Sequence, residues 1–533
     1  MEKKRGVFIQ LIALLARIPL TRIIGDEGNG IYSAAFEVYT ILLLLSVWCM
    51  PETLAKMIHA RMAREQYKNV RRVVKVTMMW NFIMSVIVCA IMIIASDYLA
   101  SYILLVPMST LTIKILGPSV FLAGFVAALR GYFQGMGTYM PTIVSDGIQQ
   151  IVTIIASIIG ALFLCNYGIK VAHLLHNNSF AAGYAVMGIG VGTLIGLFFS
   201  LLFLLFVKSI YKRKTSRLLD KDLTKGNESN GDIIRSMLYI LIPLVITGCI
   251  YNLNLIIDQI LYNGVMTING KGTEQVVNFG IYAGKYRVLM NIPIVLASAM
   301  WIPIVHALEN SYQKVDGRLI RNKIMSVYRI SMIIVMPFAI GYPLLARPVL
   351  NMLFKGNVTL SANLLLYGSS FIVFYSFYMV GNAVLQGIGR TRIVNINAFL
   401  GLVIHVLSLM LMLKYLNLDI YAIVYANIVM AVFMCCFNYI AINRYLKFTP
   451  EWVRVVGLPF VCALVASGIA KLIYTVLNGS IGNNSALIVS ILISFIAYIS
   501  IIITIRLLNE KEIKSMPGGT VILRIAKLIR LMP

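Results

Sequence analysis

The chain has 533 residues, of which 59% are hydrophobic and only 12% are charged. Several apolar runs reach 18 residues or more, the length that a helix needs to span a bilayer. A soluble domain of this size does not carry so much apolar surface, so the composition excludes a soluble protein. Because the bilayer core offers no partners to backbone polar groups, we expect these runs to be α-helices.

The formal net charge of +26 comes from 46 Lys and Arg residues against 20 Asp and Glu residues. No polar segment combines basic with aromatic residues as a nucleic-acid site would, so no nucleic-acid partner is predicted. Lys and Arg accumulate instead in the cytoplasmic loops of membrane proteins. Placing both termini in the cytoplasm collects the basic loops on one side, namely 61–75, 208–235, 314–323 and 444–454.

Fourteen membrane helices are predicted in chain order. The first resembles a signal peptide, but Arg17, Pro19 and Arg22 interrupt its apolar run, so we expect an uncleaved helix that is kinked near Pro19. Segment 97–112 is expected to be a re-entrant or surface piece. The predicted spans are 6–24, 30–58, 72–96, 113–133, 140–165, 180–207, 235–262, 277–306, 324–346, 362–388, 393–415, 419–443, 454–476 and 485–507.

The chain repeats itself at an offset of about 250 residues. Gly30-Ile31-Tyr32 recurs as Gly280-Ile281-Tyr282, at an offset of 250. Gln134-Gly135-Met136-Gly137 recurs as Gln386-Gly387-Ile388-Gly389, at an offset of 252. Two homologous halves in a hydrophobic chain indicate a transporter built from repeats, with its site between them.

The polar stretch 209–234 is predicted to be a cytoplasmic basic linker between an N-terminal six-helix lobe, 1–208, and a C-terminal six-helix lobe, 235–446. An even number of helices returns the chain to the same side, so the two lobes are expected to be parallel repeats. Two extra membrane helices, 447–507, follow the repeat. The last segment, 508–533, is predicted to be an amphipathic cytoplasmic tail on the inner leaflet, or alternatively a frayed polar end.

Ionisable side chains inside membrane helices are costly, so each is a functional candidate. Arg17 and Arg22 on the first helix suit a diphosphate, because a guanidinium matches phosphate oxygens bidentately. For Arg22 the alternative is that it extends to the outer interface. Lys285, Arg287 and Asn291 make one part of the eighth helix polar.

Acidic side chains in the spans give a second set of candidates. Glu37 is equivalent to Arg287 at the offset of 250, so these two opposite charges are expected to pair across the cavity. Asp146 and Asp258 are ion-coupling candidates, since a buried carboxylate can bind Na⁺ or carry a proton. For Asp146 the alternative is that it bonds neighbouring helices. Glu52 and Lys56 are expected to form a local ion pair.

No catalytic motif is visible, and the seven cysteines show no metal-ligand spacing. Among the five histidines, His173 and His176 alone have such a spacing, and they are expected in a short external loop where no metal site is predicted. The chain is therefore predicted not to be an enzyme and to need no cofactor or metal. Without a phosphate-binding loop it does not hydrolyse ATP, so an ion gradient, Na⁺ or H⁺, or downstream consumption would supply the drive.

Three segments resemble a known family. Arg22-Ile23-Ile24-Gly25-Asp26-Glu27-Gly28-Asn29-Gly30-Ile31-Tyr32 is similar to the end of helix one in stage V sporulation protein B and related polysaccharide-biosynthesis flippases. Leu129-Arg130-Gly131-Tyr132-Phe133-Gln134-Gly135 and Leu385-Gln386-Gly387-Ile388-Gly389-Arg390 resemble their "LRGYFQG" and "LQGxGR" segments. The resemblance covers nearly the whole chain.

The resemblance implies the multidrug/oligosaccharidyl-lipid/polysaccharide exporter fold, which includes MurJ-type lipid II flippases. It implies two six-helix lobes around a central cavity that opens alternately to each side, often with two extra C-terminal helices. It also implies cavity cations on helices one, two and eight, where this chain has Arg17, Arg22, Lys285 and Arg287 but Glu37 on helix two. Family ion sites on helices seven and eleven correspond to Asp258 and to amides such as Asn397.

The sequence thus predicts a flippase in the bacterial cytoplasmic membrane that moves an undecaprenyl-diphosphate-linked saccharide, such as lipid II or a related precursor, by alternating access. The expected partners are the lipid-linked oligosaccharide, membrane lipids and enzymes of cell-wall synthesis, in a vegetative or a sporulation role. The alternatives are a cation-coupled multidrug antiporter of the same fold and a non-transporting membrane scaffold.

Overall fold

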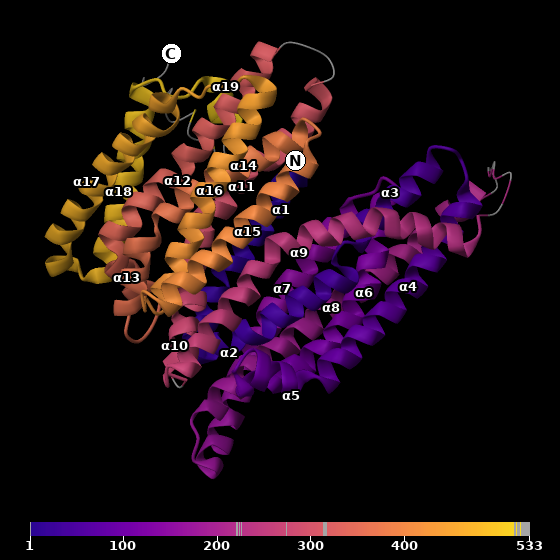
Figure 1. The fold of residues 1–533 in the computed structure, drawn as a ribbon, viewed down its shortest axis with the longest axis horizontal. Helices are drawn as coiled ribbons and strands as arrows, with labels where there is room; N and C mark the ends of the chain where they lie inside the picture. Colours follow the sequence, from indigo (N-terminus) through magenta and orange to yellow (C-terminus); the bar gives the residue numbers. More distant parts are fainter. Residues whose placement is uncertain are drawn as a thin grey trace. The chain divides into compact units, whose positions relative to one another are not determined.

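The fold is nearly all helical in the computed structural model (Figure 1). The structure describes residues 2–219, 222, 224, 226, 228–272, 274–312, 317–515, 519 and 523. Contacts divide the chain into two compact units, residues 19–280 and residues 3–18 with 281–533. Each unit is described by itself below.

The unit of residues 19–280 holds the first part of the repeat and the helix that follows the linker. Its elements are α2 (Arg17–Leu43), η1 (Leu44–Trp48), α3 (Met50–Met62), α4 (Tyr67–Ile94), α5 (Ser96–Tyr98), η2 (Leu99–Ile103), η3 (Pro107–Ser109), α6 (Thr110–Gly135), α7 (Met140–Leu175), α8 (Ser179–Leu219), α9 (Asn230–Ile268) and α10 (Glu274–Ile281). Segment 97–112, expected to be re-entrant or at the surface, forms the short pieces between α4 and α6.

The second unit holds the C-terminal helices and the start of the chain. Its elements are α1 (Glu2–Leu15), η4 (Tyr282–Tyr286), α11 (Arg287–Tyr312), α12 (Gly317–Leu353), α13 (Thr359–Gly368), α14 (Ser370–Gly387), α15 (Thr391–Lys414), α16 (Tyr421–Leu446), η5 (Val453–Gly457), α17 (Leu458–Ile481), α18 (Asn483–Thr504) and α19 (Glu510–Ser515).

The helices confirm an all-α integral membrane protein that crosses the membrane many times. Among the described residues, 12 helices are long and apolar enough to cross a membrane, or up to 13 if the bent pair α13 and α14 is one span. The run Ile9–Met62 has 54 residues, enough for two crossings, and its backbone leaves the helical region at Gly25. Counted as two crossings, it brings the number of spans to the predicted fourteen.

The first helix is interrupted at two points rather than only near Pro19. α1 ends at Leu15, one turn before Pro19, whose ring has no N–H to donate to the Leu15 carbonyl. The larger break is at Gly25, with φ of 70° and ψ of −173°, a conformation that glycine adopts without steric cost. Asn29 Nδ2 donates to the Gly25 carbonyl oxygen at 2.7 Å and so caps the break.

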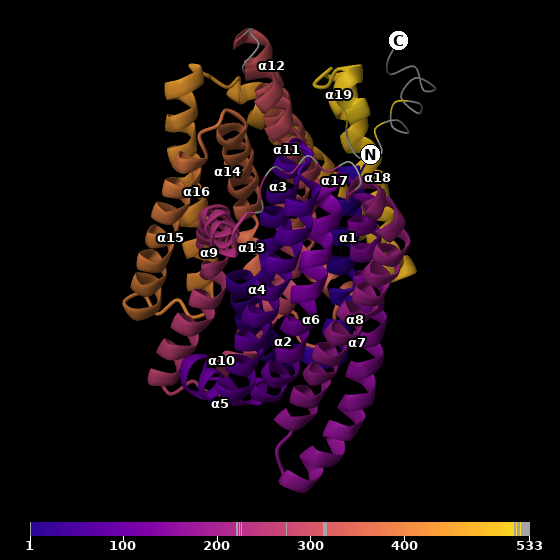
Figure 2. The ribbon, with the colours of Figure 1, turned by 90° about the vertical axis from the view of Figure 1, so that its right-hand side faces the viewer.

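Helices α7 and α8 run side by side and are longer than predicted, with 36 and 41 residues (Figure 2). Small residues allow the close approach: a Cβ on Gly188 would collide with the backbone of Gly160, and one on Gly192 with Ser157. The prediction ended the first of these helices at 165 and began the second at 180. The structure continues α7 through that segment to a short turn at 176–178. α8 begins at Ser179, within one residue of the prediction, and is longer at its other end, where it runs to Leu219.

The division into units follows a different line from the predicted lobes. α9 was predicted to begin the C-terminal lobe, but it belongs to the unit of residues 19–280, whereas residues 3–18 belong to the other unit. The lobe boundaries at 208 and 235 therefore stay a prediction. Of the predicted tail 508–533, the structure describes α19; the part beyond 515, apart from residues 519 and 523, lies outside the described residues.

The end of the predicted linker docks on the turn between α3 and α4. Arg61 makes a bidentate pair with Glu228, with Nε to Oε1 at 2.9 Å and Nη2 to Oε2 at 2.5 Å. Asp222 accepts from the Lys68 backbone N–H at 2.9 Å, and the Asn69 amide donates to the Gly226 carbonyl oxygen. We call these contacts the linker clamp. They fix the entry to α9 within its unit.

Candidate functional site

The candidate residues on the first two helices differ in burial. Arg17 is half-buried, and Arg22 is exposed, as expected for a side chain that reaches toward an interface. Glu37 is only 5% exposed. Glu37 and Arg287 belong to different units, so their pairing stays a prediction. Glu52 and Lys56 form the expected local ion pair at 2.7 Å, on the surface.

The leading glycines of the two Gly-Ile-Tyr copies, Gly30 and Gly280, meet inside the unit of residues 19–280. A Cβ on Gly30 would collide with the carbonyl oxygen of Val276, and a Cβ on Gly280 would collide with the carbonyl oxygen of Asp26. Asp26 and Val276 are themselves 250 residues apart, like the two glycines. The contact is therefore reciprocal, and it gives a physical reason for a glycine at both positions.

Lys285 is buried with 1% exposure on the π-helical segment η4. Its Nζ lies 3.5 Å from the Lys355 carbonyl oxygen and 3.4 Å from the Asn357 carbonyl oxygen. The ammonium group thus holds the loop between α12 and α13. Arg287 and Asn291, two and six residues further along, are half-buried and more accessible than Lys285.

Asp146 lies in a cluster that the sequence did not predict as a unit. Its carboxylate pairs with Arg130 Nη1 at 2.5 Å. Arg130 also donates to Ser145 Oγ at 3.0 Å, Gln149 Oε1 at 2.8 Å and Ser200 Oγ at 3.1 Å. This arginine joins α6, α7 and α8. In the sequence, the available signal for this cluster was one arginine near the end of a predicted helix, followed by Asp146 and Gln149 near the start of the next helix.

Asp258 lies on a polar, buried part of α9. Asp258 and Gln259 are each 1% exposed, and Asn263 is fully buried. Asn263 Nδ2 donates to the Leu104 carbonyl oxygen at 2.6 Å. Within the described chain, neither polar atom of the Gln259 side chain has a hydrogen-bond partner. An unsatisfied amide oxygen is a ligand that a small hard cation or a water molecule accepts.

Asn397 lies in a buried amide network of the second unit. Its Nδ2 donates to Asn438 Oδ1 at 3.0 Å, and Asn438 Nδ2 donates to Asn382 Oδ1 at 2.7 Å and to the Tyr378 carbonyl oxygen at 3.0 Å. The network joins α14, α15 and α16. These hydrogen bonds account for the position of Asn397 without a bound ion.

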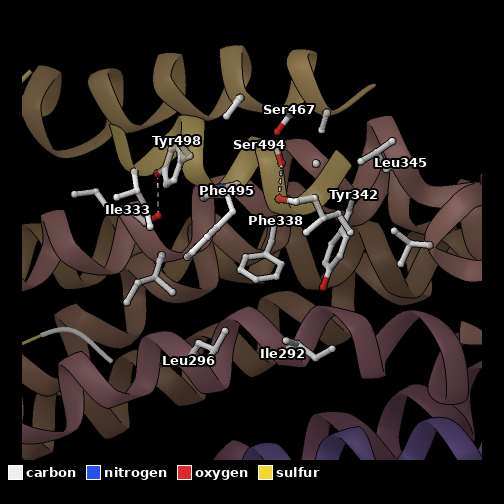
Figure 3. A pocket seen from close by; sticks show the side chains of 18 of the residues that line it. Ile292, Leu296, Ile333, Phe338, Tyr342, Leu345, Ser467, Ser494, Phe495 and Tyr498 are labelled. Atoms are coloured by element: carbon white, nitrogen blue, oxygen red, sulfur yellow. Dashed lines mark hydrogen bonds between the residues drawn. The ribbon is translucent and has the colours of Figure 1, made fainter. Parts of the chain in front are cut away.

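An apolar cavity of about 540 Å³ lies between helices of the second unit (Figure 3). α11, α12, α17, α18 and α19 contribute its walls. The hydroxyl groups of two lining tyrosines are already used: Tyr342 Oη donates to the Leu289 carbonyl oxygen and Tyr498 Oη to the Ile333 carbonyl oxygen, each at 2.9 Å. The wall thus presents mainly hydrocarbon.

The cavity is long. Its lining on α12 runs from Ile333 to Leu353, which corresponds to roughly 30 Å of helix, about the thickness of the bilayer hydrocarbon core. Sequence reasoning missed the cavity because α17 and α18 lie outside the repeat and read only as two more apolar spans.

Comparison with known proteins settles the family. Residues 5–309, more than half of the chain, match the family described as polysaccharide biosynthesis protein. The chain belongs to this family. The resemblance expected from the sequence motifs is confirmed.

Two relatives from Bacillus subtilis (strain 168) support the assignment. The lipid II flippase MurJ is 23% identical over 434 residues, covering 78% of this chain and 76% of that protein. Stage V sporulation protein B is 19% identical over 525 residues, covering 96% of this chain and 95% of that protein.

A solved structure supports the fold. Lipid II flippase MurJ in an inward closed conformation superposes with a TM-score of 0.66 at 12% identity, covering 94% of this chain and 97% of that one. The likeness confirms a multi-pass membrane protein with the transporter fold that the sequence predicted.

Proposed function

We propose that the protein is a flippase that moves an undecaprenyl-diphosphate-linked saccharide, lipid II or a related precursor, across the bacterial cytoplasmic membrane by alternating access. The observation that carries the proposal is the apolar cavity, whose hydrocarbon walls suit a polyprenyl chain. The similarity to a lipid II flippase supports the same substrate class. Both termini are proposed to be cytoplasmic, from the distribution of basic loops.

The diphosphate of such a lipid is negatively charged, so it is the group that requires positively charged side chains from the protein. In the proposal, Arg17 and Arg287 bind it, because both are half-buried and a guanidinium offers paired donors to phosphate oxygens. Asn291, on the same helix as Arg287, completes the binding set in this unit. Lys285, whose ammonium group faces loop carbonyls, orders the loop between α12 and α13.

Ion coupling is proposed at Asp258. Its buried surroundings on α9 include the unsatisfied amide of Gln259, and such oxygens suit Na⁺ or a proton. Asp146 is less suited because Arg130 already neutralises it. Enzymes of cell-wall synthesis would supply and consume the lipid; the chain itself is proposed to carry no catalytic step and no cofactor.

A cation-coupled multidrug antiporter is the second candidate, favoured by the buried carboxyl groups of Glu37 and Asp258. Half-buried arginines speak against it, since they repel cationic cargo. A dye-efflux assay in a sensitive strain distinguishes the two, because the flippase proposal expects no efflux.

The proposal is tested by filling the cavity without disturbing the fold. Gly341 lies on the cavity wall, and the nearest side-chain atom to an added Cβ, Ser467 Oγ, is 3.7 Å away. Gly341→Leu is therefore expected to fold and to reduce binding of undecaprenyl phosphate. Gly468→Leu is the matched control, because an added Cβ there meets nothing within 4 Å and the residue is not in the wall. Equal binding by both variants would count against the cavity as the lipid site.

A further inference from the structure

One end of the apolar cavity is covered by the segment that follows α18. Leu508 and Ile513 line the cavity together with Ile503 of α18, and they are 5% and 1% exposed. α19 itself has only six residues. A helix this short is not stable alone in water, so its place depends on what holds it.

A buried polar contact holds α19 to α12. The Glu512 carboxylate pairs with Arg329, and its Oε1 accepts from Ser326 Oγ at 2.6 Å. The Arg329 and Glu512 side chains are 15% and 13% exposed. An exposed ion pair contributes little to stability. Removing one partner of a pair this buried is costly, because it leaves the other charge buried without its counter-ion.

The same carboxylate also organises α19 internally. Glu512 Oε2 accepts from the Asn509 backbone N–H at 2.9 Å, three residues before it, in the arrangement by which an N3 glutamate caps a helix start. Loss of Glu512 therefore removes both the side-chain cap of the first turn of α19 and the contact with α12. The same side chain thus contributes twice to keeping Leu508 and Ile513 against the cavity.

We infer that α19 is a lid over this end of the cavity, held closed by the contact of Glu512 with Arg329 and Ser326, and that its opening admits the polyprenyl chain. The inference rests on the proposed function, because it concerns access to the proposed lipid site. Among the described residues that follow α18, Leu508 and Ile513 are the apolar side chains that line the cavity, so a long apolar chain can replace them at little cost in buried surface.

The lid is tested first by hydrogen exchange of the amides 508–515 in the full-length protein, in nanodiscs of phosphatidylethanolamine and phosphatidylglycerol. Glu512→Gln is expected to raise their exchange rate roughly tenfold. The exchanged pair, Arg329→Glu with Glu512→Arg, should restore part of the protection. Glu451→Gln is the matched control, because it breaks an exposed pair with Arg454 in the same unit. Unchanged exchange in Glu512→Gln would overturn the inference.

Access is then measured with undecaprenyl phosphate that carries a diazirine at the end of its chain, by its labelling of peptides containing Phe338 and Tyr342. The lid predicts faster labelling in Glu512→Gln than in the wild type or in Glu451→Gln. Equal labelling of all variants would overturn the lid alone and make α19 a fixed structural cap. No labelling of any variant would overturn the lid together with the proposed lipid site.

Discussion

Gly30 and Gly280 occupy equivalent positions in the two repeats, and each faces a backbone carbonyl of the other repeat. A side chain on Gly30 would meet Val276, and one on Gly280 would meet Asp26. Because the four residues are related by the same offset of 250, the crossing of α2 and α10 has local twofold character. The duplication is therefore visible as a contact as well as a sequence pattern.

Alanine at either glycine is expected to destabilise the protein, by about 1–3 kcal/mol, since a methyl group there collides with backbone that cannot move aside like a side chain. The two variants should lose similar stability, because the contact is reciprocal. Thermal unfolding of the purified protein in detergent measures the effect. Gly264→Ala is the control: nothing lies within 4 Å of its added Cβ, so the substitution should be neutral or slightly stabilising. A large difference between Gly30→Ala and Gly280→Ala would contradict the symmetry.

Arg130→Ala is expected to be more damaging than Asp146→Asn. The arginine joins Ser145, Asp146, Gln149 and Ser200, so its loss leaves several groups without partners and costs about 2–4 kcal/mol. The Asp146 side chain is 45% exposed, and water replaces part of its interaction, so Asp146→Asn should cost about 1 kcal/mol. Thermal unfolding of both variants gives the comparison; the reverse order would mean that Asp146 serves more than this cluster.

The linker clamp should loosen in acid. Burial alone raises the pKa of the Asp222 carboxyl, but hydrogen bonds from Thr224 and Lys68 outweigh it and hold the pKa below its ordinary value. A depressed pKa in the folded state stabilises the clamp above the unfolded value of about 3.9, and this is lost as the pH falls through the folded pKa. Limited proteolysis of the linker between pH 3 and pH 7 should therefore show faster cleavage only below about pH 4.

Two variants separate the contributions to the clamp. Asp222→Asn is expected to remove the acid-dependent change in cleavage. Arg61→Ala, which breaks the pair with Glu228, should increase cleavage at neutral pH as well. An acid profile that Asp222→Asn leaves unchanged would assign the effect to another group.

Periodicity and charge predicted the helices and the fold because both act locally: a bilayer demands apolar runs of fixed length, and basic loops report its sides. The cluster around Arg130, the lid contact between Arg329 and Glu512, and the cavity were not predictable in the same way. Each depends on residues from different helices whose packing the sequence pattern does not specify. The break at Gly25 is an intermediate case. The glycine was visible in the sequence, but Pro19 nearby was the stronger predictor of a helix break, so the kink was predicted there instead.

The central claim is that this chain carries a diphosphate-linked polyprenyl saccharide through charges contributed by Arg17 and Arg287. Mass spectrometry of lipids that co-purify with the protein tests it most directly. The account predicts an undecaprenyl-diphosphate-linked saccharide with the wild type, and its loss in Arg17→Ala with Arg287→Ala but not in the surface control Lys56→Ala. Retention of the same lipid by the double variant, or its absence from the wild type, would contradict the account.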